Sequence, residues 1–132
     1  GAERPNALIL GTGGAAKAVK YVLDNLDIGV QYVSRNPSKA EHSLSYQELN
    51  EELIRGAKLI VNTSPLGMYP NMDLYPDIPY AGIGSSHFLF DLIYNPALTS
   101  FLKKGMDRGA SVKNGLEMLA LQADASWEIW NS

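Results

Sequence analysis

A glycine-rich turn, set between an apolar run and a helical pattern, limits most strongly how this chain can fold. The apolar run covers residues 7–10 and stops at Gly11. After the turn, apolar residues recur at the spacing of one helix face; these are Ala15, Ala18, Val19, Val22, Leu23 and Leu26. This order of strand, turn and helix is typical of the first βαβ unit of an α/β domain.

The turn fits the pattern G-x-G-x-x-G/A, with Gly11, Gly13 and Ala16 in the three small-residue positions. In this pattern the first glycine permits a tight turn, the second lets a pyrophosphate approach the backbone, and the third residue lets helix and strand pack closely. The N–H groups and the dipole at the helix start favour an anion. We therefore predict a dinucleotide site whose phosphates lie against Gly11, Thr12, Gly13, Gly14 and Ala15. The alternative is a glycine turn without a ligand.

The remainder of the chain alternates apolar strands with helical segments. Further strands are expected at residues 30–33, 58–61, 87–93 and 110–113, with a short extended piece at Leu44. Helices are expected between them and at the end of the chain, from a cap at Asn114 to about Trp130. The alternation predicts one α/β domain over residues 1–132, a Rossmann-like, doubly wound, mostly parallel sheet of about six strands with helices on both faces.

Local signals indicate where two of these helices begin. A capping-box pattern at residues 45–48 predicts a helix from there to Gly56. The Asn-Pro pair at residues 95–96 predicts the start of another helix, which Gly109 ends. Residues 69–86 are rich in Pro, Asp, Tyr and Gly, and we expect them to form a surface loop with at most one helical turn.

The stretch after the second strand bears on which dinucleotide fits. About 20 residues past the glycines, an acid binds the ribose 2′-hydroxyl, whereas an arginine accommodates a 2′-phosphate. No acid stands at the end of this strand, which instead offers the donors Ser34, Arg35, Asn36 and Lys39. Arg35 presents a planar fork to a phosphate and a face for stacking on adenine. This predicts NADP as the cofactor, and a solvated basic loop is the alternative.

A second polar turn, Asn62, Thr63 and Ser64, follows the strand at residues 58–61. Ligands in open α/β sheets lie at the carboxyl ends of the strands, so this turn is expected at the same edge as the glycines. Its side chains are candidates for hydrogen bonds to the ribose or the nicotinamide. An ordinary polar turn is the alternative.

Composition excludes several other classes of function. The 132 residues contain no cysteine, which excludes disulfides, thiol nucleophiles and zinc–thiolate sites, and no metal site is expected. A net charge of −3 provides no basic field for nucleic acid. Without an apolar run of membrane-spanning length or a secretory signal, the protein is expected in the cytoplasm and not in a membrane. His42 and His87 are expected to be structural.

Five segments, taken in order, resemble the C-terminal, cofactor-binding domain of shikimate dehydrogenase, and the resemblance covers nearly all of the chain. The segments are Gly11-Thr12-Gly13-Gly14-Ala15-Ala16, Ser34-Arg35-Asn36 with Lys39, Asn62-Thr63-Ser64-Pro65-Leu66-Gly67-Met68, Asp91-Leu92-Ile93-Tyr94-Asn95-Pro96, and Asn114-Gly115-Leu116-Glu117-Met118-Leu119 followed by Gln122. Ser34 and Asn36 stand where the family more often has Asn and Thr, and Lys39 stands where an arginine is frequent. These departures keep hydrogen-bond donors or charge in place.

The resemblance implies NADP-dependent, reversible reduction of 3-dehydroshikimate to shikimate, a step toward the aromatic amino acids. It implies that Leu92 and Gly115 touch the nicotinamide half of the cofactor, while Tyr94 and Gln122 bind the substrate. Without the resemblance, Tyr94 would be read as an aromatic residue at a strand end and Gln122 as a polar residue on a helix flank.

The family's proton-transferring lysine and aspartate belong to an N-terminal substrate domain or its junction, outside this chain. We therefore assign no catalytic acid or base here, and expect the chain to be inactive alone and to share its substrate with that domain. The alternatives are a quinate or shikimate dehydrogenase that uses NAD, another two-domain dehydrogenase of similar build, and a non-catalytic module that senses NADP.

Overall fold

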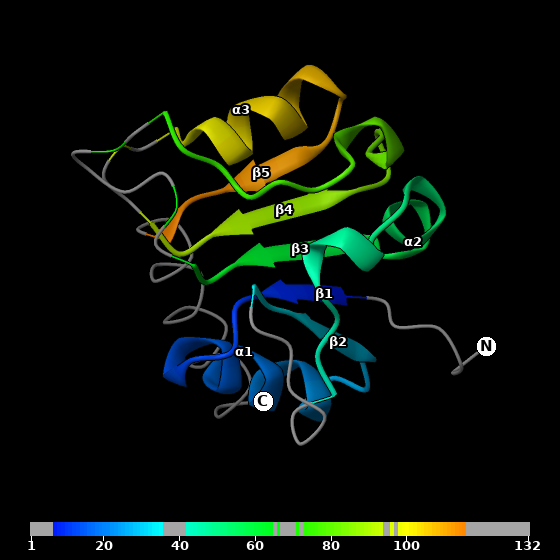
Figure 1. Cartoon of the computed structure of the whole chain (residues 1–132), viewed down its shortest axis with the longest axis vertical. Helices are drawn as coiled ribbons and strands as arrows, with labels where there is room; N and C mark the ends of the chain where they lie inside the picture. The colour runs from blue at the N-terminus through cyan, green and yellow to red at the C-terminus, as the bar shows by residue number, and fades with distance from the viewer. Residues whose placement is uncertain are drawn as a thin grey trace, which may run out of the picture.

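The computed structural model describes residues 7–35, 42–64, 66, 71, 73–93, 96 and 98–115. Within them, five strands alternate with helices along the chain (Figure 1). In order, the elements are β1 (Ala7–Leu10), α1 (Gly14–Asn25), β2 (Val30–Val33), the 3₁₀ turn η1 (Tyr46–Glu48), α2 (Glu51–Gly56), β3 (Leu59–Asn62), the 3₁₀ turn η2 (Tyr80–Gly82), β4 (Phe88–Asp91), α3 (Ser100–Asp107) and β5 (Ser111–Lys113).

The strands form one parallel sheet in the order β2-β1-β3-β4-β5. Leu44 makes a parallel bridge to Val33, on the last residue of β2. This bridge places one residue of the expected extended piece beside β2, where a sixth strand would lie. The expectation of about six parallel strands is thus met by five strands and a single bridged position, and the Rossmann-like fold class is confirmed.

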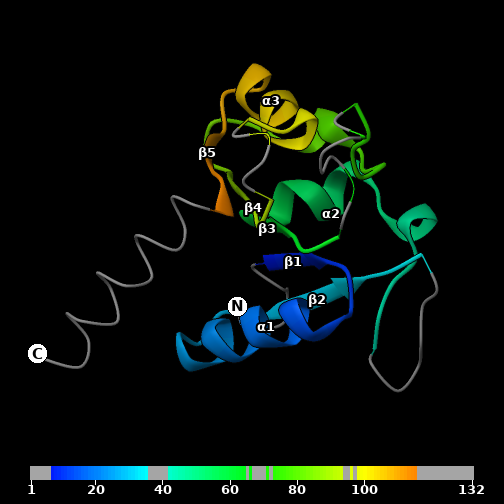
Figure 2. The ribbon, with the colours of Figure 1, turned by 90° about the vertical axis from the view of Figure 1, so that its left-hand side faces the viewer.

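Helices cover both faces of the sheet, and the strand residues alternate between two apolar cores. Leu8 and Leu10 belong to the larger core, which α2 and α3 cover with Ile54, Phe101 and Leu102. Ala7 and Ile9 belong to the smaller core beneath α1. Figure 2 shows α1 on one side of the sheet, and α2 and α3 on the other. Because β1 is buried on both of its faces, its four residues are all apolar.

The expected face of α1 was partly wrong. Ala16 and Leu23 are buried, whereas Val22 and Leu26 are 45% and 56% exposed. The strip of α1 that faces β1 and β2 contains Ala16 and Leu23. These two residues are seven positions apart and therefore lie on one face of the helix. Apolar residues occupy two neighbouring strips of this helix, and the sequence pattern alone did not distinguish them.

The predicted starts of two other helices also need correction. The capping box at Ser45 is present, but it closes only η1, after which Leu49 is extended and Asn50 caps the separate helix α2. The Asn50 Oδ1 accepts the Leu53 N–H at 2.8 Å. Likewise, α3 begins after Thr99 and not at residues 95–96, because the Thr99 hydroxyl accepts the Leu102 N–H at 3.2 Å. In both cases a side-chain oxygen nearer the helix supplies the N-cap.

The described part of the expected surface loop packs against the protein interior. Ile78 and Ile83 are 5% and 2% exposed and belong to the larger core. The Arg108 side chain donates to the carbonyls of Ile83 at 3.3 Å and Ala81 at 2.9 Å, which ties the loop to the end of α3. The loop therefore forms part of the layer on that face of the sheet.

Candidate functional site

Parallel pairing brings the ends of all five strands to one edge of the sheet. Backbone hydrogen bonds continue across this carboxyl edge beyond the strands: Gly11 N–H donates to Val33 O at 2.7 Å, and Thr63 N–H to Leu10 O at 3.0 Å. Leu92 N–H donates to Asn62 O at 3.1 Å, and Gly115 N–H to Ile93 O at 3.2 Å. The turns that follow β1, β3, β4 and β5, which the sequence singles out, therefore lie side by side.

The glycine turn is shaped to leave the start of α1 open. Gly11 has a φ of +124°, and a Cβ built on it would overlap the Thr63 hydroxyl, so this position requires glycine. Gly13 and Gly14 are exposed, and no atom lies within 4 Å of a Cβ built on either. The N-cap residue of α1 is Gly13, which has no side chain to cap the helix. The N–H groups of its first turn can accordingly receive an anion.

The third small position of the motif, Ala16, is 0% exposed and packs with Ala7 and Ile9 of β1. Its small side chain allows α1 and β1 to pack closely, as the pattern predicts.

The polar turn after β3 is held in shape by its own side chains. The Thr63 hydroxyl donates to Leu10 O at 2.8 Å, which fixes the turn against the end of β1. Asn62 is 0% exposed, and its Oδ1 accepts from Ser64 N–H at 3.0 Å and from the Ser64 hydroxyl at 2.5 Å. Its Nδ2 donates to Asp91 Oδ1 at 3.2 Å and to Leu66 O at 3.4 Å. Both ends of this amide are occupied by protein partners, which favours a role in shaping the turn over direct contact with a ligand.

Asp91 and Thr99 form part of this arrangement, although they were not among the predicted site residues. Asp91 is 0% exposed at the last position of β4, where the register places it opposite Asn62. Burial raises the pKa of this carboxyl above its ordinary value, and the hydrogen bonds from Thr99, Ile93 and Asn62 oppose the rise. The signal in the sequence was an acid inside the apolar run Phe88-Leu89-Phe90-Asp91-Leu92-Ile93.

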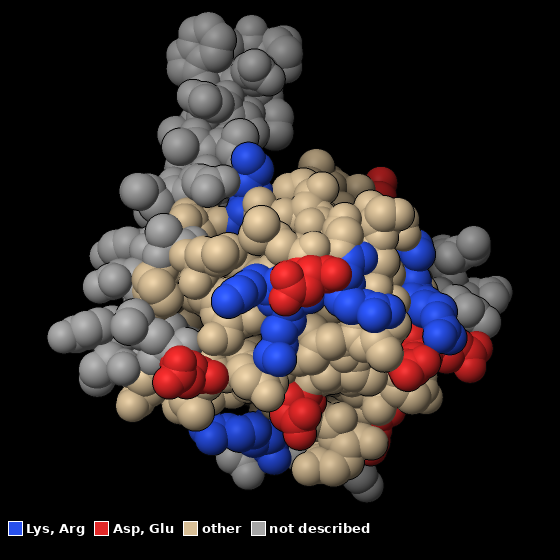
Figure 3. All heavy atoms as spheres, turned by 90° about the horizontal axis from the view of Figure 1, so that it is seen from above, with Lys and Arg blue, Asp and Glu red and all other residues tan. Residues whose placement is uncertain are grey.

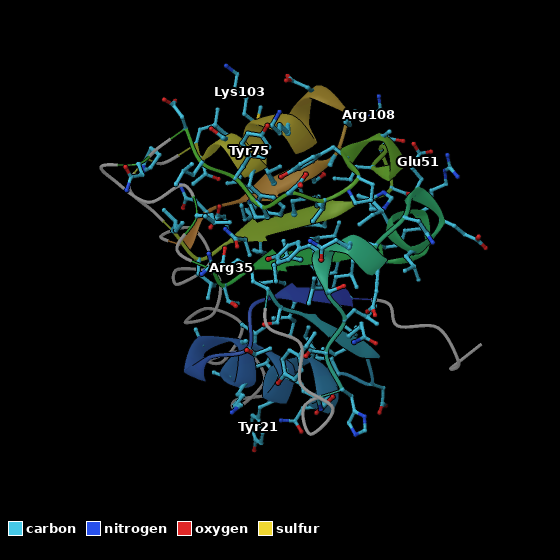
Figure 4. All side chains as sticks on the ribbon, in the orientation of Figure 1. Tyr21, Arg35, Glu51, Tyr75, Lys103 and Arg108 are labelled. Atoms are coloured by element: carbon cyan, nitrogen blue, oxygen red, sulfur yellow. The ribbon has the colours of Figure 1, made fainter. Side chains whose placement is uncertain are left out.

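At the end of β2, Ser34 is half-buried and Arg35 is exposed. Figure 4 shows Arg35 on the side of the sheet toward which the strand arrowheads point. Within the described part of the chain Arg35 makes no ion pair. Burial raises the pKa of the Tyr46 hydroxyl, and the positive charge of Arg35 opposes that rise. Asn36 and Lys39 lie outside the described residues.

At the other end of the edge, the predicted pair Leu92 and Gly115 is in contact. A Cβ built on Gly115 would overlap the carbonyl oxygen of Leu92, so only glycine fits there. Tyr94, Gln122 and the expected terminal helix lie outside the described residues.

The two histidines occupy places that suit structural roles. His87 is 3% exposed; its Nδ1 accepts the Gly84 N–H at 3.1 Å, which makes Nε2 the donor to Ile54 O at 2.6 Å. His42 lies in a turn with a φ of +53°, and its carbonyl accepts from the Gln31 side chain at 2.6 Å.

Other features of a site were sought across the described residues. Among them no cluster of His, Asp and Glu is arranged to hold a metal ion. None of their helices is long and apolar enough to cross a membrane. On the face over α3, shown in Figure 3, basic and acidic side chains are interspersed. The carboxyl edge is thus where the predicted binding residues gather, and its open helix start, exposed guanidinium and polar turns suit an extended, phosphate-bearing ligand.

Known proteins were compared with this chain by sequence and by structure. No protein-family profile matches it. The shikimate dehydrogenase (NADP(+)) of Methanococcus maripaludis strain C6 is 41% identical over 141 residues, which cover 95% of this chain and 49% of the relative.

Solved structures agree with the sequence relatives. A chorismate mutase/shikimate 5-dehydrogenase fusion protein from Clostridium acetobutylicum is 38% identical, with a TM-score of 0.73 over 98% of this chain and 48% of the other. The shikimate 5-dehydrogenase of Thermus thermophilus, solved with NADP(H) and shikimate, is 28% identical, with a TM-score of 0.73 over 96% of this chain and 49% of the other.

The chain spans about half the length of the curated relatives it matches. Its parallel sheet and the glycine turn after β1 agree with the resemblance noted from the sequence. By sequence and by structure, the chain is therefore similar to the shikimate dehydrogenases over about half of their length, and it resembles their C-terminal, Rossmann-like domain.

Proposed function

We propose that this chain binds NADP along the carboxyl edge of its sheet, as the cofactor-binding part of an NADP-dependent shikimate dehydrogenase. The observation that carries the proposal is the order of the turns: the glycine turn, Arg35, the Thr63 turn and the Leu92–Gly115 contact follow ends of strands in one sheet. An extended dinucleotide lying across this edge would meet a phosphate site in the middle and separate places for its two ends.

Each part of the cofactor has residues suited to it. The pyrophosphate is assigned to Gly11, Thr12, Gly13, Gly14 and Ala15, at the uncapped start of α1. The adenosine 2′-phosphate is assigned to Ser34 and Arg35, with Asn36 and Lys39 as further donors. The nicotinamide half is assigned to the turn of Thr63 and Ser64, shaped by Asn62, and to Leu92 and Gly115.

In the whole enzyme, NADPH would deliver a hydride to the carbonyl carbon of 3-dehydroshikimate, and the reverse step would regenerate it from shikimate. This chain would bind the cofactor and hold its nicotinamide at one end of the edge, within reach of the substrate. Tyr94 and Gln122 are proposed to contact the substrate from this side. Residues 1–132 would form the C-terminal half of a two-domain cytoplasmic enzyme, with the groups that move protons supplied by the other domain.

A calorimetric titration of the chain with NADP and with NAD tests the proposal. We expect NADP to bind more tightly, because the Arg35 guanidinium recognises the 2′-phosphate. Replacing Arg35 by Ala removes a charge-assisted hydrogen bond and should lower NADP affinity by about tenfold to a hundredfold, with little change for NAD.

Arg55 provides a matched control, since it is exposed on α2 and pairs with Glu51 at 3.0 Å. Arg55→Ala should leave both affinities unchanged. Failure of both nucleotides to bind the unmodified chain would refute the proposal, and tighter binding of NAD would refute its cofactor assignment.

A further inference from the structure

Asp91 joins three backbone segments of the carboxyl edge through hydrogen bonds that it only accepts. Its Oδ1 accepts from Asn62 Nδ2 at 3.2 Å and from Ile93 N–H at 3.0 Å, and its Oδ2 accepts from the Thr99 hydroxyl at 2.7 Å. Thr99 and Asn62 are both 0% exposed. An ionised carboxylate is the one side chain of this size that accepts at both oxygens.

Each of the three residues that donate to Asp91 makes a further hydrogen bond to a neighbouring segment. Asn62 holds Ser64 through its own Oδ1, at 3.0 Å from the Ser64 N–H. Ile93 accepts the Gly115 N–H at 3.2 Å through its carbonyl, which links β4 to the turn after β5. Thr99 caps α3 by accepting the Leu102 N–H at 3.2 Å. One buried carboxylate thus fixes the turn after β3, the turn after β4 and the start of α3 relative to one another.

The Asp91 network reaches only one half of the edge. It contacts segments that follow β3, β4 and β5, whereas the glycine turn and Arg35 follow β1 and β2. On the proposed function, these two halves face the nicotinamide and the adenosine ends of the dinucleotide, respectively.

The geometry points to Asp91 as the positioning residue for the nicotinamide half of the site, acting through Asn62, Ile93 and Thr99 without touching the cofactor. This inference rests on the proposed function. It explains why a buried carboxylate, which is costly to desolvate, stands at the end of an otherwise apolar strand. Its hydrogen bonds hold the turns that must present Ser64, Leu92 and Gly115 in one arrangement.

Two probes separate the halves of the site: NADP, and adenosine 2′,5′-bisphosphate, which lacks the nicotinamide half. Calorimetry gives the ratio of their affinities, and we expect NADP to bind the unmodified chain more tightly. Asp91→Asn replaces one carboxylate oxygen by an NH₂ group, which cannot accept a hydrogen bond, so at least one of the three donors to Asp91 loses its acceptor. It should lower the affinity for NADP by about tenfold and leave that for the bisphosphate unchanged.

Two controls distinguish positioning from general destabilisation. Ile60→Val removes one methylene from a side chain that is 0% exposed in the larger core, so it should lower the melting temperature without changing the affinity ratio. Thr99→Ser keeps the hydroxyl that donates to Asp91 and should retain the ratio, whereas Thr99→Val removes it and should behave like Asp91→Asn.

The inference is overturned if Asp91→Asn leaves the affinity ratio unchanged, or if Thr99→Ser lowers it as much as Thr99→Val. Equal binding of both probes by the unmodified chain overturns it as well, because no contribution of the nicotinamide half would then exist. Binding of neither probe refutes the proposed function itself, so the two failures are distinguishable.

Discussion

Replacing Gly11 by alanine is expected to destabilise the fold by about 2–6 kcal/mol, the sum of two costs. The backbone at Gly11 has a φ of +124°, which costs an alanine about 1–3 kcal/mol. The added Cβ would also overlap the Thr63 hydroxyl, which is held in place by its 2.8 Å bond to Leu10 O. Displacing a fixed group in a packed site costs about 1–3 kcal/mol more.

Urea unfolding, followed by circular dichroism, measures this loss, provided that the chain unfolds in the single cooperative transition we expect of it. The double variant Gly11→Ala/Thr63→Ala, compared with Thr63→Ala alone, removes the overlap and retains the backbone strain. It should therefore show a smaller loss, of about 1–3 kcal/mol.

Gly13→Ala is the matched control within the same turn. A Cβ at Gly13 would meet no atom within 4 Å, so the stability should change by less than about 1 kcal/mol. The same Cβ would occupy the approach of the pyrophosphate, and NADP binding should fall sharply. Equal urea midpoints for Gly11→Ala and the unmodified chain would refute the reasoning. An equal loss of stability in Gly11→Ala and Gly13→Ala would also refute it.

Two further predictions follow from buried groups. Burial raises the pKa of the Asp91 carboxyl in the folded chain, so the stabilisation that this shift gives the folded state is present below about pH 4 and is lost as the pH rises through the raised pKa. The free energy of unfolding of the unmodified chain, measured relative to that of Asp91→Asn, should therefore fall with rising pH. A difference between the two free energies that does not change with pH would contradict this. Gly105→Ala should destabilise the chain although alanine favours helices, because a Cβ there would lie 2.5 Å from Leu89 Cδ2. Gly56→Ala, where no atom lies within 4 Å, should not, and equal melting temperatures for these two variants would speak against the close packing of α3 on β4.

The sequence predicted those parts of the fold that depend on local pattern. The apolar run before Gly11, the glycine turn and the helix after it required only spacing and residue size, and β1 and α1 lie where they were expected. The parallel sheet followed from alternation of strands and helices, and with it the meeting of the polar turns at one edge.

Other features depend on contacts that spacing does not reveal. The buried strip of α1 is set by the position of β1 and β2, while its sequence allows two neighbouring apolar strips. The caps at Asn50 and Thr99 compete with earlier signals through single hydrogen bonds. The Asp91 network joins residues 29 positions apart, and only the register of β3 against β4 places Asn62 and Asp91 opposite each other.

The central claim is that the carboxyl edge of the sheet binds the dinucleotide. The most direct test is to follow the backbone amide signals of the ¹⁵N-labelled chain by nuclear magnetic resonance while NADP is added. We predict that the signals that shift belong to residues 11–15, to Ser34 and Arg35, to Thr63 and Ser64, and to Leu92 and Gly115. Shifts centred on the opposite edge, at Ala57, Gly84 and Gly109, or no shifts at saturating NADP, would contradict the claim.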